Sequence, residues 1–281
     1  MRYLITGASG MLGRDVRAAL VDRAVTALSR AELDISDPAA VRAAVSGHDV
    51  VINCAAYTKV DEAEAHEDAA YAINATGAGN LARAAARAGA TLVHVSTDYV
   101  FDGTAKTPYG EDAPLAPVSA YGRSKAAGER IVLQENPGRT LIVRAAWLYG
   151  AHGPNFAKTM LRLAAEQEKI TVVYDQVGQP TWTLDFATNI VALLDSGAES
   201  GTYHATNSGQ ASWFEFARAI LRAADLDPSR VKPTDSSRFV RPAPRPAYSV
   251  LGHDAWRREG LSPIRDWREA LTAAAAAGVL E

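Results

Sequence analysis

Short apolar runs alternate with amphipathic stretches along the first half of the chain. The apolar runs predict strands, at residues 2–6, 25–28, 49–53, 91–95 and 140–143. Between them apolar side chains recur every three or four residues, which predicts helices. A short helix is predicted at residues 38–45 and one long helix at about 67–88. Strands that alternate with helices favour a parallel sheet, because parallel strands need a crossover connection. We therefore predict an α/β fold with a doubly wound parallel sheet.

The second half continues the same pattern with longer helices. Helices are predicted at residues 155–168, 183–194, 213–224 and 264–277, and strands at 170–174 and 202–205. Asp37, ahead of Pro38, and Ser212 are predicted N-caps. The length of 281 residues fits one large domain, or a nucleotide-binding domain with a smaller partner domain.

A glycine-rich turn follows the first predicted strand. Gly7, Gly10 and Gly13 have GxxGxxG spacing and lead into a helical pattern. In that context the first glycine permits a tight turn, the second lets the backbone approach a pyrophosphate, and the third lets the helix pack on the strand. The start of the helix favours an anion. The turn predicts a dinucleotide site, with a structural glycine turn as the alternative. The residues assigned to this site are Gly7, Ser9, Gly10, Met11, Leu12 and Gly13.

The end of the second strand indicates which dinucleotide binds. An acid there would bind the ribose 2′-hydroxyl of NAD and repel a 2′-phosphate, but the chain has Ser29 and Arg30. Both side chains can hydrogen-bond a phosphate, so the sequence favours NADPH, with NADH as the alternative. Arg30 could instead be a solvated loop residue. We predict that Asp34 and Ile35 lie beside the adenine.

Small residues follow the third strand. Cys54, Ala55 and Ala56 stand past its carboxyl end, where ligands bind in open α/β sheets. Small side chains there would let a cofactor lie on the backbone. Because no base adjoins Cys54, we interpret it as a buried filler rather than a nucleophile. Tyr57 and Asn74 are also assigned to the cofactor site.

The stretch SAYGRSK, residues 119–125, carries the candidate chemistry. Tyr121 and Lys125 are four residues apart and therefore share one helix face. An ammonium beside a phenol lowers the phenol's pKa from roughly 10, which would make Tyr121 a proton donor and acceptor near neutral pH. Taken alone, such a pair is most often a surface contact, so the interpretation depends on its surroundings.

Polar groups at the end of the fourth strand supply those surroundings. Ser96 and Thr97 are predicted to stand opposite Tyr121, with Ser96 also assigned to the cofactor site, and Asp98 and Tyr99 to line the same cleft. Any one of them could be a strand-end cap, but four polar groups together favour a site.

Composition argues against several other classes of function. The formal net charge of -3 provides no basic field for a nucleic acid or a membrane surface. With Cys54 as the one cysteine, an intramolecular disulfide and a Cys-based zinc site are excluded. No run of 18 apolar residues occurs and a strand pattern begins directly after Met1, so we expect no signal peptide and a cytoplasmic protein.

Four motifs together resemble a known family. GASGMLG at 7–13, STDYVFDG at 96–103, YGRSK at 121–125 and RAAWLYG at 144–150 are similar to the extended short-chain dehydrogenase/reductase superfamily. More narrowly, they resemble the dTDP-4-dehydrorhamnose reductases. The resemblance continues through NFAKTM at 155–160, DQVGQPT at 175–181 and Arg245-Pro246, so it covers most of the chain.

This resemblance implies NADPH-dependent reduction of dTDP-4-dehydro-L-rhamnose to dTDP-L-rhamnose. The nicotinamide would give a hydride to the sugar ketone. Tyr121 would protonate the developing alkoxide, Lys125 would hold the nicotinamide ribose, and Thr97 would hydrogen-bond the carbonyl oxygen. The residues that the resemblance places in the substrate cleft are Val60, Asp61, Tyr99, Trp147, Asn155 and 176–181.

A proline-rich stretch at residues 238–245 is predicted to be a loop. Its Arg238, Arg241 and Arg245 could meet a nucleotide diphosphate by bidentate contacts, with a solvated basic loop as the alternative. We assign Arg245 to the substrate site.

Two features depart from the family pattern. Some of these reductases are dimers bridged by magnesium through glutamates, but Asp15 and Glu269 do not belong to a clear acidic cluster. We therefore expect no metal, and a monomer or weak homodimer. Lys59 stands where a small residue is expected.

Two other functions stay open. One is another extended reductase or epimerase that acts on a different nucleotide sugar, and the other is a non-catalytic NADP-binding regulatory subunit. The intact Tyr121, Lys125 and Thr97 argue against the regulatory subunit, which needs no proton donor.

The predicted domains follow from these assignments. Residues 1–150 form a Rossmann domain that binds NADP(H), and residues 173–196 return to it. Residues 151–172 and 197–281 form a smaller C-terminal α/β domain that binds the substrate.

Overall fold

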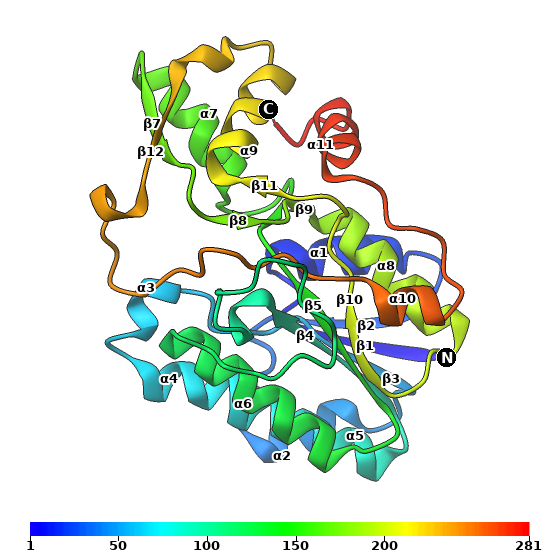
Figure 1. The fold of residues 1–281 in the computed structure, drawn as a ribbon. Coiled ribbons are helices and arrows are strands. Elements are labelled where there is room, and N and C mark those ends of the chain that lie inside the picture. Colours follow the sequence, from blue (N-terminus) through cyan, green and yellow to red (C-terminus); the bar gives the residue numbers. More distant parts are fainter. Residues whose placement is uncertain (281) are drawn as a thin grey trace.

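A six-stranded parallel sheet forms the centre of the structure, a computed structural model that describes residues 1–280 (Figure 1). Its strands, in spatial order, are β10 (Gly201–His204), β5 (Thr140–Ala145), β4 (Thr91–Thr97), β3 (Val50–Asn53), β1 (Arg2–Thr6) and β2 (Ala24–Leu28). All neighbouring pairs are parallel. From β1 the chain adds β2 on one side and then β3 on the other, so the order reverses at β1. The predicted doubly wound sheet is confirmed, and a crevice for a ligand is expected at this reversal.

Helices cover both faces of the sheet. On one face α1 (Met11–Ala19) and α8 (Thr183–Ser196) pack over a buried cluster that includes Ile5, and on the other α2 (Pro38–Val45) and α5 (Ala78–Ala88) pack over a cluster that includes Leu4. Adjacent strand residues point to opposite faces, which explains why Leu4 and Ile5 serve different layers. Burial on both faces explains the near-continuous apolar runs of the strands.

The crossover between β3 and β4 differs from the prediction of one helix. It comprises α3 (Val60–Ala63), α4 (Glu67–Tyr71), a π-helical segment at Ala72–Gly77 and then α5. π-Helical segments are rare and are frequent at functional sites. Asn74, assigned to the cofactor site, lies in this segment. α6 (Ala120–Glu135) follows β4 and packs beside α5.

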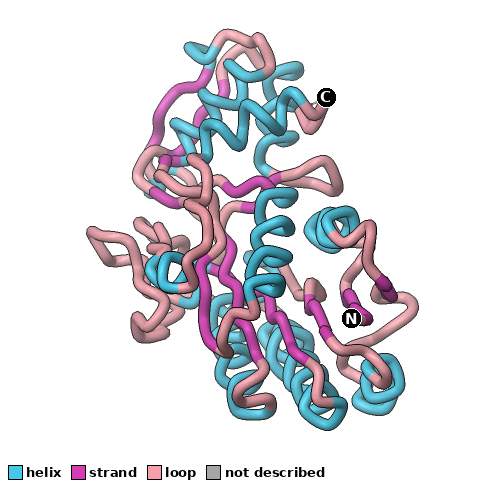
Figure 2. The backbone as a smooth tube through the Cα atoms, turned by 90° about the vertical axis from the view of Figure 1, so that its right-hand side faces the viewer, coloured by secondary structure: helices cyan, strands magenta, loops and turns pink. Residues whose placement is uncertain are grey.

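A second group of elements forms a smaller layer with its own core. It contains α7 (Phe156–Glu166), β7 (Ile170–Val173), α9 (Trp213–Ala223), β12 (Val231–Thr234) and α11 (Trp267–Ala276). β7 pairs in parallel with β12, and a separate buried cluster that includes Phe216 and Trp267 holds the group together. In Figures 1 and 2 it lies above the sheet-containing part.

Short elements complete the described chain. The strands are β6 (Leu148–Tyr149), β8 (Val177–Gly178), β9 (Thr181–Trp182) and β11 (Ala211–Ser212), and the remaining α-helix is α10 (Asp254–Arg258). Single 3₁₀ turns lie at Asp98–Val100, Pro228–Arg230 and Ser236–Arg238.

The C-terminal part of the chain contributes to the large sheet. β10 pairs with β5, and Trp256 of α10 packs in the same cluster as α1 and α8. The predicted division assigns all of residues 197–281 to the smaller domain, and these two segments depart from it. Their apolar side chains complete the face of the sheet beneath α8, which local periodicity does not reveal.

Candidate active site

The start of α6 brings the predicted catalytic residues together. Ser119 caps the helix, since its Oγ accepts a hydrogen bond of 3.1 Å from the backbone N–H of Gly122. A Cβ on Gly122 would lie 2.2 Å from the carbonyl oxygen of Tyr99, so only glycine lets the helix approach the end of β4. As a result, the rings of Tyr99 and Tyr121 meet edge to face with centroids 5.7 Å apart.

The environment of Tyr121 differs from the prediction. Burial raises the pKa of its phenol to about 12, with a smaller lowering from hydrogen bonding to Thr97 and a raising effect of Asp98. Lys125 does not act on it as expected, because its Nζ donates a hydrogen bond of 2.6 Å to the carbonyl oxygen of Val95. The predicted lowering of the Tyr121 pKa by Lys125 is therefore wrong for this structure. The reason is that burial penalises the phenolate more than its neighbours stabilise it.

Lys125 itself is almost fully enclosed, with 2% of its surface exposed. Burial lowers the pKa of its ammonium to about 8, while Glu129 and Cys54 act to raise it. Burial also raises the pKa of the Cys54 thiol to about 12, which makes it a poor nucleophile at neutral pH, although its side chain is half-buried rather than fully buried as predicted.

Thr97 and Asp98 are coupled by a hydrogen bond. The Thr97 hydroxyl donates to Asp98 Oδ1 at 2.9 Å and accepts from the backbone N–H of Tyr99 at 3.3 Å. Burial raises the pKa of Asp98 to about 6. A hydroxyl has one proton, so Thr97 must rotate away from Asp98 before it can donate to a ketone oxygen.

The glycine turn has the geometry of a dinucleotide site. Gly7 has a φ of +68°, and a Cβ on it would lie 2.6 Å from the backbone nitrogen of Ala55. A Cβ on Gly13 would lie 2.4 Å from the carbonyl oxygen of Gly7, whereas a Cβ on Gly10 would meet only that oxygen, at 3.2 Å. Gly7 and Gly13 thus serve backbone packing, while Gly10 faces more open space. Gly10 is also the N-cap of α1 and makes no side-chain cap, which leaves N–H groups for an anion.

An acid three residues beyond Ser29 folds back onto the end of β2. Both the backbone N–H and the Oγ of Ser29 donate to Glu32 Oε2, at 2.8 and 2.7 Å. Ser29 and Arg30 stand at the strand end as the sequence indicates, but the turn returns the carboxylate of Glu32 to Ser29. Asp34 is likewise engaged, by Ser36, and the side chain of Ile35 is buried in the core beside Gly77.

Asn74 ties the crossover to α6. Its Oδ1 accepts from the backbone N–H of Tyr57 at 2.8 Å, and its Nδ2 donates to the Tyr57 carbonyl at 3.1 Å and to Ser124 Oγ at 2.9 Å. Ser124 directly precedes Lys125. Asn74 thus holds the loop that carries Tyr57 against α6.

Two residues assigned separately to the substrate form an ion pair. Asp61 Oδ1 accepts from Arg245 Nη2 at 2.9 Å and from the backbone N–H of Ala243 at 3.2 Å, and Arg241 lies 3.8 Å from Asp61 Oδ2. Asp61 follows Val60 at the start of α3. Both Asp61 and Arg245 influence the pKa of Tyr99, which burial raises, so the ion pair lies close to Tyr99, whose ring contacts that of Tyr121.

The other assigned substrate residues lie between the sheet and the smaller layer. Trp147 has a φ of +47° and stacks on Trp213 with centroids 3.5 Å apart. Asn155 caps α7 and donates to the carbonyl oxygen of Gly150 at 2.9 Å. Gln179, within the predicted 176–181 stretch, is 2% exposed and bonds the backbone of Leu251, which indicates a structural role.

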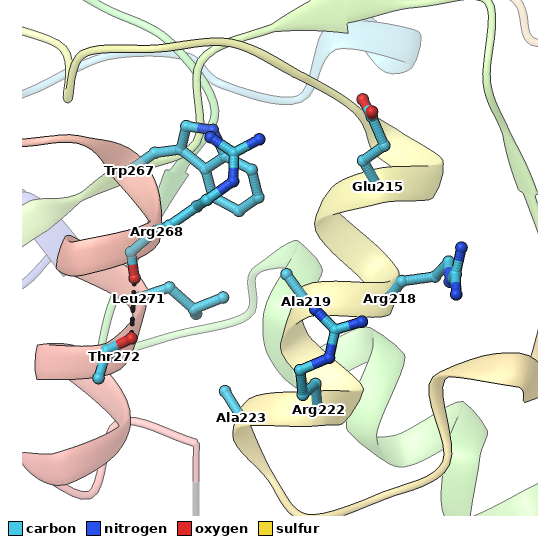
Figure 3. A pocket seen from close by; sticks show the side chains of 9 residues that line it. All are labelled: Glu215, Arg218, Ala219, Arg222, Ala223, Trp267, Arg268, Leu271 and Thr272. Atoms are coloured by element: carbon cyan, nitrogen blue, oxygen red, sulfur yellow. Dashed lines mark hydrogen bonds between the residues drawn. The ribbon is translucent and has the colours of Figure 1, made fainter.

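A cavity of about 350 Å³ lies elsewhere, between α9 and α11 (Figure 3). Its lining, which contains none of the assigned site residues, is Glu215, Arg218, Ala219, Arg222, Ala223, Trp267, Arg268, Leu271 and Thr272. Within residues 1–280 no group of three or more His, Cys, Asp or Glu side chains is arranged to hold a metal ion. No helix in the same range is long and apolar enough to cross a membrane.

Comparison with known proteins decides the family. A family model described as the RmlD substrate binding domain matches residues 1–279. The chain belongs to this family. Among RmlD-family relatives, a dTDP-4-dehydrorhamnose reductase of Streptomyces griseus is 52% identical over 280 residues, which cover 96% of this chain and 92% of that protein. A dTDP-4-keto-6-deoxy-D-glucose reductase of Streptomyces niveus is 51% identical over 277 residues, which cover 97% of this chain and 96% of that protein.

Solved structures agree with this assignment. The dTDP-4-dehydrorhamnose reductase of Bacillus anthracis, in complex with NADP, has a TM-score of 0.94 at 40% identity and covers 98% of this chain and 99% of its own. The resemblance carried by the glycine turn, STDYVF and YGRSK is therefore confirmed, and this RmlD-family chain is an NAD(P)H-dependent oxidoreductase of the extended short-chain type.

Proposed function

We propose that the protein reduces dTDP-4-dehydro-L-rhamnose to dTDP-L-rhamnose with NADPH. The observation that carries this proposal is the meeting of Tyr121, Thr97 and Lys125 at the end of β4, in a chain of the RmlD family. The reductase of S. griseus and the NADP complex from B. anthracis support the substrate and the cofactor.

The environment of Tyr121 suits an acid in the reductive direction. With a pKa raised to about 12 by burial, the phenol keeps its proton at neutral pH. An alkoxide that develops on the sugar is a strong base and takes that proton readily. The nicotinamide, when bound, supplies the hydride. Lys125, which now donates to the Val95 carbonyl, would hold the ribose hydroxyls of the cofactor, and the Thr97 hydroxyl, which now donates to Asp98, would donate to the ketone oxygen.

We further propose how the two ligands divide the molecule. The glycine turn, Ser29–Arg30, Cys54–Ala56 and Asn74 would hold the cofactor. Asp61, Tyr99, Trp147 and the loop with Arg245 would hold the nucleotide sugar. Apart from the strand and helix corrected above, the domain division follows the same lines. A cytoplasmic location and a monomeric or weakly dimeric state stay predictions from the sequence.

A substrate assay tests the function. NADPH absorbance is followed after addition of dTDP-4-dehydro-L-rhamnose, and in parallel after addition of dTDP-4-keto-6-deoxy-D-glucose, because the S. niveus relative bears that name. We expect the rhamnose precursor to be reduced with the higher kcat/KM. Preference for the D-glucose compound would reassign the substrate, and absence of NADPH oxidation with both active substrates would reject the reductase function.

A further inference from the structure

A buried acid lies one helical turn after Lys125. Glu129 is four residues further along α6, so both side chains share one face, and each is 2% exposed. An acid and a lysine at this spacing usually pair. Here the Lys125 ammonium donates to the Val95 carbonyl at 2.6 Å, and Glu129 does not pair with it within the described chain. Something must therefore hold the carboxylate back.

Arg144 of β5 holds it. Arg144 Nε donates to Glu129 Oε1 at 2.9 Å and Arg144 Nη2 donates to Oε2 at 2.8 Å, a bidentate pair with both side chains at most 3% exposed. This geometry occupies both oxygens of the carboxylate and directs it toward the sheet rather than toward Lys125.

Three further contacts fix the guanidinium. Its Nη1 lies 3.2 Å from the carbonyl oxygen of Glu111 and 3.1 Å from His204 Nε2, and its Cζ lies 4.9 Å from the centre of the Phe101 ring. His204 Nδ1 lies 2.8 Å from the carbonyl oxygen of Gly252, which can only accept, so Nδ1 carries the proton. Nε2 is then free to accept from Arg144. The pKa of His204, lowered by burial, agrees with a neutral ring.

The charges that face Lys125 are few. Tyr121 and Glu129 face it from its own helix, Cys54 from the end of β3 and His94 from β4. The pKa of Cys54 is raised to about 12 by burial and that of His94 is lowered by burial, so both are neutral near pH 7. The phenol of Tyr121 is also neutral. Of these groups only Glu129 is an anion, and it acts to raise the pKa of Lys125.

We propose that Glu129 is a positioning residue for Lys125: its carboxylate keeps the neighbouring amine positively charged, while Arg144 prevents the two from pairing. A buried ion pair is often no more stable than apolar residues of the same volume, so its place behind a catalytic lysine needs a reason beyond stability. The arrangement supplies an ammonium that is charged yet free to reach the nicotinamide ribose. The catalytic meaning rests on the proposed reductase function, but the electrostatic claim does not.

Two single variants should shift the pKa of Lys125 in opposite directions. Glu129→Gln removes the anion and leaves the Arg144 charge, so the pKa of Lys125 should fall by about one unit or more. Arg144→Met frees the carboxylate to pair with the ammonium, so the pKa of Lys125 should rise by a similar amount. The measurement is a pH titration of the side-chain ε-carbon signals in protein labelled with ¹³C-lysine. The chain has six lysines, and Lys125→Met assigns the relevant signal.

The control lies on the same helix. Glu135 pairs with Arg83 at 2.8 Å and is ten residues beyond Lys125, roughly 15 Å along the helix axis. Glu135→Gln should leave the Lys125 titration unchanged. Two single variants that move the Lys125 pKa in the same direction, or leave it where it is, would overturn the proposal, because a purely structural ion pair predicts no opposite shifts.

Folding failure does not remove the test. If Arg144→Met does not fold, the double variant Glu129→Gln/Arg144→Met removes both buried charges. The pKa of Lys125 in this double variant should lie between its value in the parent and its value in Glu129→Gln. A Lys125 pKa in the double variant equal to that of the parent would again contradict the proposal. In the reductase assay, Glu129→Gln should lower the pH above which kcat/KM declines. If the Lys125 pKa shifts are seen by NMR but no substrate is reduced, the proposed reductase function fails while the electrostatic proposal stands.

Discussion

Burial controls the ionisation of the active-site side chains more than neighbouring charges do. It is the largest cause of the raised pKa values of Tyr121 and Asp98 and of the lowered pKa of Lys125. A site that disfavours charge keeps Tyr121 protonated and lowers the basicity of Lys125. Such a site is suited to deliver a proton to an alkoxide rather than to remove one from an alcohol at neutral pH.

The clearest residue-scale prediction concerns Tyr121. Tyr121→Phe keeps the ring that packs against Tyr99 but removes the proton donor, so kcat should fall on the order of 10²–10⁴. The NADPH dissociation constant, measured by fluorescence titration, should stay within a factor of about two or three, well under 1 kcal/mol. Tyr71→Phe, on a side chain that is 44% exposed on α4, is the matched control. A Tyr121→Phe enzyme with the parent rate would remove Tyr121 as the acid.

Asp98 should lower stability at neutral pH. Its pKa in the folded protein, about 6, lies above the ordinary value of 3.8, so the folded state disfavours the carboxylate. The cost is absent below pH 3.8 and grows as pH rises toward and past 6. Asp98→Asn should therefore raise the free energy of unfolding at pH 7 by on the order of 1–3 kcal/mol, and by much less at pH 4.

Thermal or urea unfolding at both pH values measures this difference. Asp112→Asn, at an exposed position in the loop before α6, provides the control and should change stability little at either pH. Equal effects of Asp98→Asn at pH 4 and pH 7 would show that shape, rather than buried charge, sets its contribution.

At the scale of elements, the glycine turn combines packing with ligand binding, and its glycines should separate the two. Gly13→Ala places a Cβ where it would be 2.4 Å from the Gly7 carbonyl, so α1 must move off β1 and the protein should lose stability by about 1–3 kcal/mol. Gly10→Ala meets that oxygen at 3.2 Å and its φ of -71° suits alanine, so the fold should be retained. Its Cβ would instead obstruct the approach of a pyrophosphate.

The measurements are unfolding by urea and NADPH affinity for both variants. Gly10→Ala should bind NADPH at least about tenfold more weakly with a nearly unchanged unfolding midpoint, a loss of about 1.4 kcal/mol in binding. If Gly10→Ala binds NADPH like the parent, the dinucleotide lies elsewhere or approaches the turn differently.

Local pattern explains why most elements were predictable and several contacts were not. The bounds of β1 and α2 and the caps at Asp37 and Ser212 agree with prediction, because periodicity and capping depend on neighbouring residues. The π-helical segment was missed because it departs from the helix in hydrogen bonding, not in composition. The Tyr121 pKa was missed because burial depends on the whole fold.

In the candidate site, too, local patterns were predictable and contacts between distant segments were not. The glycine turn and YGRSK were found from spacing along the chain. Glu129 could have been noticed, since it shares the i, i+4 face of Lys125, but its partner Arg144 comes from a different strand. Asp61 of α3 pairs with Arg245, which lies in a loop near the end of the chain, so the spacing of residues in the sequence could not predict this contact.

At the scale of the whole molecule, the two parts meet around the candidate substrate cleft. The Asp61–Arg245 ion pair connects the crossover after β3 with the loop that leaves the smaller layer. Asn155, at the start of α7, lies 3.8 Å from the sulfur of Met11 in the glycine turn. A residue that we assign to the substrate thus lies beside one that we assign to the cofactor, which is the placement that hydride transfer between two bound molecules requires.

This arrangement predicts that substrate and cofactor affinity can be changed separately. Arg245 is one-fifth exposed, and an ion pair of this kind contributes little to stability, so Arg245→Ala should fold and unfold much like the parent. If Arg245 turns from Asp61 to the diphosphate when the nucleotide sugar binds, its loss removes a charge-assisted contact worth about 1.5–3 kcal/mol, and KM should rise by at least about tenfold. The NADPH dissociation constant should not change, because no cofactor residue depends on Arg245.

The control is Arg257→Ala, which removes an exposed arginine paired with Asp254 and should alter neither the KM for the nucleotide sugar nor the NADPH dissociation constant. A KM that stays at the parent value would leave Arg245 as a structural partner of Asp61 alone, whereas parallel losses of NADPH and sugar affinity would mean that the two parts of the site are not independent.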